Sequence, residues 1–330
     1  MVDALHEDEE GTHLDVLAWG YLAVMHRLHV RELPVPPVEG MAGSLAIPTL
    51  MADAPLVALA LSKAGHTVTA ALSHPGSNPE AMAAMHLMHK HLQGCQFGPN
   101  CGTPFHLQVL LKSGKHIWLS DPTRGLESLL TANSQSVARW VYVDAYAWLG
   151  ALFEESIPRP SFQDGIFVNI GALPSNELKS AATKWRRFAG TGQLIVQASA
   201  GDLTLPDTEI IRLSRLIASS GTDFAVLTAG DAGLAVTSSK GTSYARSERI
   251  DCVKLGTDPC GAGAAVSASV LHTLLTGVRS EECLATRAAE AGRVQCMVSG
   301  SLGKNLLRDW VAALQFVSGR GSLYGDHAEA

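Results

Sequence analysis

The sequence lacks any apolar run near the roughly 20 residues that a membrane-spanning helix needs. Its first ten residues are acidic, whereas a secretory signal peptide starts with basic residues and continues with an apolar segment. These two absences predict a cytoplasmic protein that has no membrane partner.

Cysteine and positive charge are also scarce. The 6 cysteines among 330 residues form no dense spacing pattern, so we expect reduced thiols in place of a disulfide framework. Lys and Arg number 25 against 31 Asp and Glu, which gives a formal net charge of -6. Direct binding of nucleic acid is not expected, because it needs a surplus of cations facing the phosphates.

The chain is rich in core-forming residues, with 46% hydrophobic and 17% charged. This balance and a length of 330 residues predict one large α/β domain with a small appendage. We expect that domain to span residues 13–318. An acidic mobile tail over 1–12 and a loose tail over 319–330 would flank it.

Short apolar runs alternate with helical patterns, which is typical of βα units around a mainly parallel sheet. Strands are expected at Leu14–Gly20, His66–Leu72, Trp140–Asp144, Gly165–Asn169, Leu194–Gln197, Phe224–Thr228 and Leu234–Ser238. Helices are expected at Ala54–Gly65, Asn78–Leu92, Val266–Thr276 and from Ser280 to Val298.

Two further segments predict a small β-lid, at about 26–48 and 103–120. The first has only short stretches of regular apolar spacing and is rich in proline. The second contains Phe105–Leu119, which alternates and has Ser-Gly in its middle like a hairpin.

The most specific motif is Asp258–Ala265 (DPCGAGAA), which leads directly into a long apolar helix. Glycines at a helix start let backbone amides approach an anion, and the helix dipole favours negative charge there. The alternative is that the glycines serve only a tight turn or close packing. Upstream, Thr228–Gly233 (TAGDAG) ends a predicted strand.

These two motifs, in this order, resemble those of the ribokinase-like (PfkB) carbohydrate and nucleoside kinase family. There, a strand ending in Thr-x-Gly-x-x-Gly is followed by Asp-Thr-x-Gly-Ala-Gly-Asp at a helix start. The resemblance is clearest over about 224–300 and weaker over the rest of the chain. It implies a three-layer α/β/α sandwich with a β-lid, through which family members commonly dimerise.

The resemblance also implies a cofactor site for ATP or ADP with Mg, if nucleotide binding is retained. The residues matching the nucleotide- and phosphate-contacting motifs are Thr228, Gly230, Gly233, Asp258, Gly261, Ala262 and Gly263.

The chain departs from the family where the chemistry takes place. The family's catalytic base corresponds to Ala264, and loss of a general base removes about two to four orders of magnitude in rate. The Asp that grips a sugar diol corresponds to Met25, and the pocket positions Ala23 and Leu56 are apolar as well.

The family's Asn-x-x-Glu element, which orients magnesium-bound water, has no counterpart in Gln197–Asp202. Losses at several sites favour natural divergence over a single engineered change. The sequence therefore predicts a degenerate family member, a pseudokinase that binds a ligand or partner. Two alternatives remain: a divergent ATP-dependent sugar or nucleoside kinase with a substitute base, for which Asp258 is the nearest candidate, and a structural subunit that pairs through its lid.

A second cluster contains residue types that bind zinc or copper, namely His86, His89, His91, Cys95 and Cys101. Zinc sites usually have tighter cysteine pairs, so we favour a solvated helix face and assign no metal site.

Two smaller features also have a structural alternative. Cys260 lies beside the glycine turn, where a helix start can lower a thiol pKa, but a buried inert thiol is the favoured interpretation. Lys184–Arg187 (KWRR) is a compact basic and aromatic cluster suited to stacking, and a surface helix end is favoured there.

Overall fold

The structure is a computed structural model that describes residues 14–30, 43–111, 116–121, 123–131, 136–145, 161–200, 205–250, 260–298, 302 and 304–318. The expected tails over 1–12 and 319–330 lie outside these residues, as does Asp258.

A nine-stranded sheet forms the centre, in the order β13-β12-β11-β10-β9-β8-β1-β4-β5. Its strands are β1 (Leu14–Gly20), β4 (Val68–Leu72), β5 (Gln96–Phe97), β8 (Val137–Asp144), β9 (Ser161–Ala172), β10 (Gln193–Ser199), β11 (Phe224–Thr228), β12 (Leu234–Thr237) and β13 (Thr242–Ala245). Neighbours pair in parallel except at β12, which is antiparallel to both β11 and β13. Continuous apolar strands suit this sheet because helices cover both faces.

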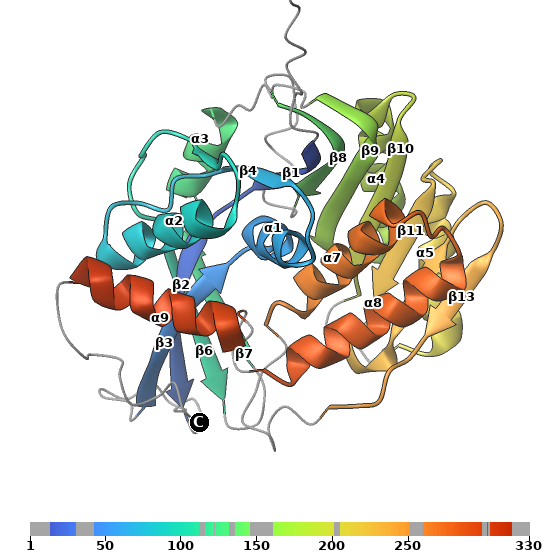
Figure 1. Ribbon diagram of the computed structural model, residues 1–330. Helices are drawn as coiled ribbons and strands as arrows, with labels where there is room; N and C mark the ends of the chain where they lie inside the picture. Colours follow the sequence, from blue (N-terminus) through green and yellow to red (C-terminus); the bar gives the residue numbers. More distant parts are fainter. Residues whose placement is uncertain are drawn as a thin grey trace, which may run out of the picture.

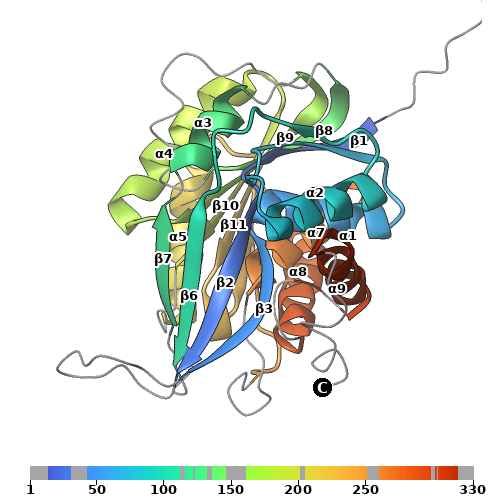
Figure 2. The ribbon, with the colours of Figure 1, turned by 90° about the vertical axis from the view of Figure 1, so that its left-hand side faces the viewer.

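Helices form the outer two layers (Figures 1 and 2). One face carries α1 (Asp53–Lys63), α2 (Pro79–His91), α7 (Ala262–Leu275), α8 (Glu281–Cys296) and α9 (Lys304–Ser318). The other carries α3 (Thr123–Thr131), α4 (Ser175–Ala189) and α5 (Asp207–Ala218). Each face of the sheet has its own apolar core cluster, so the expected three-layer sandwich is confirmed.

A separate four-stranded sheet forms the lid, in the order β3-β2-β6-β7, and extends away from the body in Figure 2. It consists of β2 (Ala23–Val30), β3 (Gly43–Met51), β6 (Phe105–Leu111) and β7 (His116–Asp121). The expected hairpin is present, since β6 pairs antiparallel with β7. The Tyr21 hydroxyl lies 2.6 Å from His106 Nε2 and links the lid to the end of β1.

Within the described part of the chain, no helix is both long enough and apolar enough to cross a bilayer. The structure forms no disulfide between the described cysteines, Cys95, Cys101, Cys260, Cys283 and Cys296.

Candidate functional site

The candidate site lies at the carboxyl ends of the central strands, beside β1. The chain order reverses at β1, which has β4 on one side and β8 on the other, and ligands of open α/β sheets bind at such reversals. Gly20 ends β1 where the start of α1 comes very close. A Cβ on Gly20 would lie 2.5 Å from Ala54 Cβ and 2.8 Å from Asp144 Cβ, so only glycine allows this approach.

Three polar side chains form a rung across β8, β9 and β10. Asp144 pairs with Asn169, and Asn169 pairs with Gln197, because the parallel strands are in register there. These side chains are 0%, 3% and 3% exposed. The rung places hydrogen-bonding groups under the starts of α1 and α7.

Asp144 caps α1 from the end of β8. Its Oδ2 accepts backbone N–H groups of Asp53 at 3.0 Å and Ala54 at 3.4 Å. Its Oδ1 is buried and has no hydrogen-bond partner. Burial, and secondly the charge of Asp53, raise the pKa of Asp144 well above its usual value. This carboxyl therefore keeps a proton to higher pH than an exposed aspartate.

Asp53, the first residue of α1, brings a carboxyl group to the glycine turn. Its Oδ2 accepts a 2.6 Å hydrogen bond from Asn169 Nδ2. The same oxygen lies 3.5 Å from the position that a Cβ on Gly263 would take. A carboxyl group therefore stands beside the start of α7, although position 264 there is alanine.

Ala52, just before α1, has a backbone conformation that suits glycine. With φ 78° and ψ 153° it is the one non-glycine residue of the described chain at positive φ. An L-residue held there is strained by roughly 1–3 kcal/mol.

The glycine turn itself is tied to the sheet. Gly261 has φ 82° and precedes α7. The carbonyl oxygen of Gly263 accepts a 3.1 Å hydrogen bond from Gln197 Nε2. The Ser267 hydroxyl lies 3.1 Å from the same carbonyl oxygen and 2.9 Å from Gln197 Oε1. Ala264 is only 2% exposed, and Ala262 is partly buried.

The predicted substrate positions are apolar in the fold as well as in the sequence. Ala23 and Met25 are fully buried, and Leu56 packs against the core. No polar side chain is supplied by these positions.

The predicted nucleotide turn follows β11. The Thr228 hydroxyl donates to the Ala198 carbonyl at 3.3 Å, and Gly230 has φ 52° with no atom near its Cβ position. At Gly233 a Cβ would lie 2.5 Å from the Ala245 carbonyl oxygen. Close packing and a φ of 105° both require glycine at 233, whereas Gly230 faces open space.

The residues of the metal hypothesis have other contacts. His91 Nε2 lies 3.0 Å from Asp309 Oδ2, and the His89 ring stacks edge-on against Phe97. Burial raises the pKa of the Cys95 thiol to about 12. In the part of the chain that the structure describes, no group of three potential ligands comes together.

The two smaller features have structural contacts. The Cys260 carbonyl accepts a 3.2 Å hydrogen bond from Gln295 Nε2. Arg186 donates to the Gly190 carbonyl at 2.7 Å and contacts Asp223, so it closes the end of α4.

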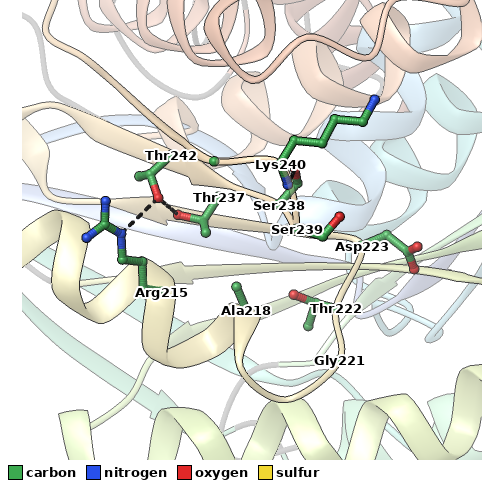
Figure 3. A pocket seen from close by; sticks show the side chains of 11 residues that line it. Arg215, Ala218, Gly221, Thr222, Asp223, Thr237, Ser238, Ser239, Lys240 and Thr242 are labelled. Atoms are coloured by element: carbon green, nitrogen blue, oxygen red, sulfur yellow. Dashed lines mark hydrogen bonds between the residues drawn. The ribbon is translucent and has the colours of Figure 1, made fainter.

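A groove of about 580 Å³ lies at the opposite end of β11, between α5 and the β12–β13 hairpin (Figure 3). Arg215 Nε donates to Thr242 Oγ1 at 3.1 Å. In Figure 3 the Lys240 side chain points away from Arg215, so the two cations do not converge on one ligand. The groove is also separate from the polar rung, because it begins at the amino end of β11.

The fold places the chain among proteins of known structure. It is similar to a microbiome-derived acarbose kinase, with 20% identity, a TM-score of 0.61 and 91% and 100% of the two chains covered. A putative ribokinase from Agrobacterium tumefaciens has 15% sequence identity and a TM-score of 0.64, and the match covers 94% of this chain and 100% of that one. A nucleoside kinase from Methanocaldococcus jannaschii, an archaeal member of the ribokinase family, has 14% identity and a TM-score of 0.63. That match covers 90% of this chain and 98% of the other.

The chain therefore has the ribokinase-like fold of carbohydrate and nucleoside kinases, as the resemblance implied. No family model matches the sequence. No curated protein matches it either.

Proposed function

We propose that the chain is a non-catalytic ribokinase-fold protein, which acts by binding a small ligand or a protein partner. One observation carries this proposal: Ala264 and Met25 stand where kinases of the family have two carboxylates, and both are buried, at 2% and 0% exposure. A buried methyl group cannot take a proton, and a buried thioether cannot hold a diol.

A phosphate-transfer assay tests the loss of kinase chemistry. The wild-type protein with Mg-ATP and a panel of sugars and nucleosides should form no product above the protein-free rate. Ala264→Asp should gain little activity, because Met25 still occupies the diol position, and Ala264→Asn serves as its uncharged control. Robust wild-type turnover would refute the proposal, and strong rescue by Ala264→Asp would reveal a lesion at one site.

The second candidate is a divergent sugar or nucleoside kinase in which Asp53 replaces the base. It is favoured by the 3.5 Å separation between Asp53 Oδ2 and the Cβ position of Gly263. Phosphoryl transfer depends mainly on positioning and electrostatics, so a carboxylate from another helix is a workable base. If so, Asp53→Asn should lower kcat by about two to four orders of magnitude and change KM little. Asp258 stays a predicted substitute outside the described residues.

For a protein partner, we propose a second copy bound through the lid. Phe105 on β6 and Leu119 on β7 are 53% and 50% exposed, which places two large apolar side chains on the lid surface. Light scattering on the eluting protein should give a dimer, and Phe105→Ser with Leu119→Ser should give a monomer. The matched control is Met82→Ser, an exposed residue of α2. A wild-type monomer at micromolar concentration would refute the dimer.

Cytoplasmic location also stays a proposal. It is supported by the acidic composition and by the absence of disulfides between the described cysteines.

A further inference from the structure

We propose that the groove between α5 and the β12–β13 hairpin (Figure 3) is a second ligand site, which binds a small polyol carrying an oxyanion group, either phosphate or carboxylate. Arg215 and Thr242 hold the oxyanion, and Thr222 contacts a hydroxyl group of the polyol. The groove begins at the amino end of β11, whereas the glycine turn lies at the carboxyl ends of the strands. The site therefore goes beyond the proposed function and does not depend on it.

The lining of the groove indicates the class of ligand. Its volume of about 580 Å³ falls within the roughly 300–1,000 Å³ that is usual for small-molecule sites. Among the described residues that line it, none is aromatic or a large aliphatic one, so an apolar ligand has no anchor. Hydroxyl groups predominate instead, from Thr222, Thr237, Ser238, Ser239 and Thr242. A small molecule with many hydrogen-bonding groups suits this lining.

One end of the groove presents hydrogen-bond donors. Arg215 lies in the last turn of α5, and its Nε donates to Thr242 Oγ1 at 3.1 Å. This bond orients the guanidinium group, and its two Nη groups have no other partner within the described chain. Thr242 Oγ1 also accepts the Thr237 hydroxyl at 3.1 Å, so its own hydrogen stays available. A guanidinium fork beside a hydroxyl donor matches the oxygens of a phosphate or a carboxylate.

The charge at this end also favours an anion. Asp223 is the only carboxylate among the described residues that line the groove. It accepts the Leu194 backbone N–H at 2.8 Å and pairs with Arg186 at 3.4 Å. In Figure 3 it lies at the opposite end of the groove from Arg215. The positive charge of Arg215 is therefore not neutralised within the groove.

Thr222 supplies an independent observation that points to a ligand. It lies between Arg215 and Asp223 in Figure 3 and is 8% exposed. Its Oγ1 is buried and has no hydrogen-bond partner in the protein. Buried polar atoms are nearly always paired, so this hydroxyl marks a position that the protein leaves unfilled. Turning it toward a ligand in the groove breaks no hydrogen bond of the folded chain.

The test uses glycerol 3-phosphate, glycerate and glycerol, which all carry hydroxyl groups and differ in the anionic group. Calorimetric titrations of the full chain should show binding of at least one of the two anions, and glycerol should bind at least tenfold more weakly. The tighter anion identifies phosphate or carboxylate as the preferred group. Arg215→Gln should weaken anion binding about tenfold, because it removes the charged fork. Lys240→Gln is the matched control: this lining cation points away from Arg215, and its loss should change the affinity less than twofold.

Thr222→Val tests the contact with the polyol, since valine keeps the shape and removes the hydroxyl. It should weaken the preferred anionic polyol at least threefold and leave the affinity for inorganic phosphate unchanged. It should not lower the unfolding free energy, because the deleted hydroxyl has no partner in the protein. A merely structural hydroxyl would give the reverse, with lost stability and unchanged binding.

Absence of binding by both anions at about 10 mM would overturn the proposal. Equal losses of affinity in Arg215→Gln and Lys240→Gln would overturn it as well, because they would indicate attraction to surface charge in general. Urea unfolding verifies each variant. Should Arg215→Gln be misfolded, Arg215→Lys replaces it, since lysine keeps the charge, lacks the fork and should still weaken binding severalfold.

Discussion

Replacing Ala52 by glycine should stabilise the folded protein, although the change removes a methyl group. Ala52 has φ 78° and ψ 153°, a conformation that glycine adopts freely and alanine adopts at a cost of roughly 1–3 kcal/mol. Glycine also gains about 0.5–1 kcal/mol of conformational freedom in the unfolded chain, which opposes folding. The difference predicts a net stabilisation of roughly 0.5–2 kcal/mol.

The assay is equilibrium unfolding in urea, with equal m-values for both proteins so that the midpoints report stability. The other end of α1 offers the reciprocal control. Gly65 has φ 89° and no atom within 4 Å of its Cβ position, so Gly65→Ala introduces the strain without a clash. It should destabilise the protein by about 1 kcal/mol.

A neutral or destabilising Ala52→Gly, measured beside a destabilising Gly65→Ala, would refute the reasoning. It would mean that the positive φ before α1 carries little strain in the folded protein.

Acid should destabilise the protein through His106, because burial lowers the pKa of this side chain to about 4. The unfolded chain therefore binds the proton first, and stability is lost as pH falls from about 6.5 to about 4, by up to roughly 3 kcal/mol. Urea midpoints across this range should show a loss that His106→Gln lacks. Asp144→Asn should stabilise the protein more at pH 7 than at pH 4. The reason is that the raised pKa of Asp144 makes the wild type lose stability as pH rises above about 4. An equal change in unfolding free energy at both pH values would contradict this. Gly125→Ala should lower the unfolding free energy by roughly 1–3 kcal/mol, since its Cβ would lie 2.0 Å from the Tyr21 ring. Gly241 has no atom within 4 Å of its Cβ position, so Gly241→Ala should change the unfolding free energy by less than about 0.5 kcal/mol.

Much of the central sheet could be predicted from the sequence, because its strands are short apolar runs bounded by glycine or polar residues. The predictions for Leu14–Gly20 and Phe224–Thr228 match β1 and β11 residue for residue. Within α4 (Ser175–Ala189) the sequence prediction covers only a helix end at Lys184–Arg187, although Leu178, Ala182, Trp185 and Ala189 recur at helical spacing and are all buried. That amphipathic signal was present in the sequence, and the abundance of polar residues around it obscured it.

The candidate site was harder to predict, because its residues meet only through the fold. Asp144 and Asn169 end two predicted strands, where polar groups often face a ligand, but a single sequence does not show which strands are neighbours. Asp53 comes from a third segment. Its proximity to Gly263 follows from the approach that Gly20 allows and from the positive φ of Ala52, and neither is visible without coordinates.

The structure also changes which sequence departure argues most strongly against kinase activity. Ala264 stands where the resemblance places the family's carboxylate on α7, and Asp53 brings a carboxyl group to the same turn from α1. The Met25 position has no such neighbour among the predicted pocket positions, which are all apolar. Phosphoryl transfer depends mainly on positioning its reactants. Failure to hold the acceptor alcohol should therefore lower the rate more than the absence of an ideal base. It follows that Met25→Asp combined with Ala264→Asp should restore more activity than Ala264→Asp alone.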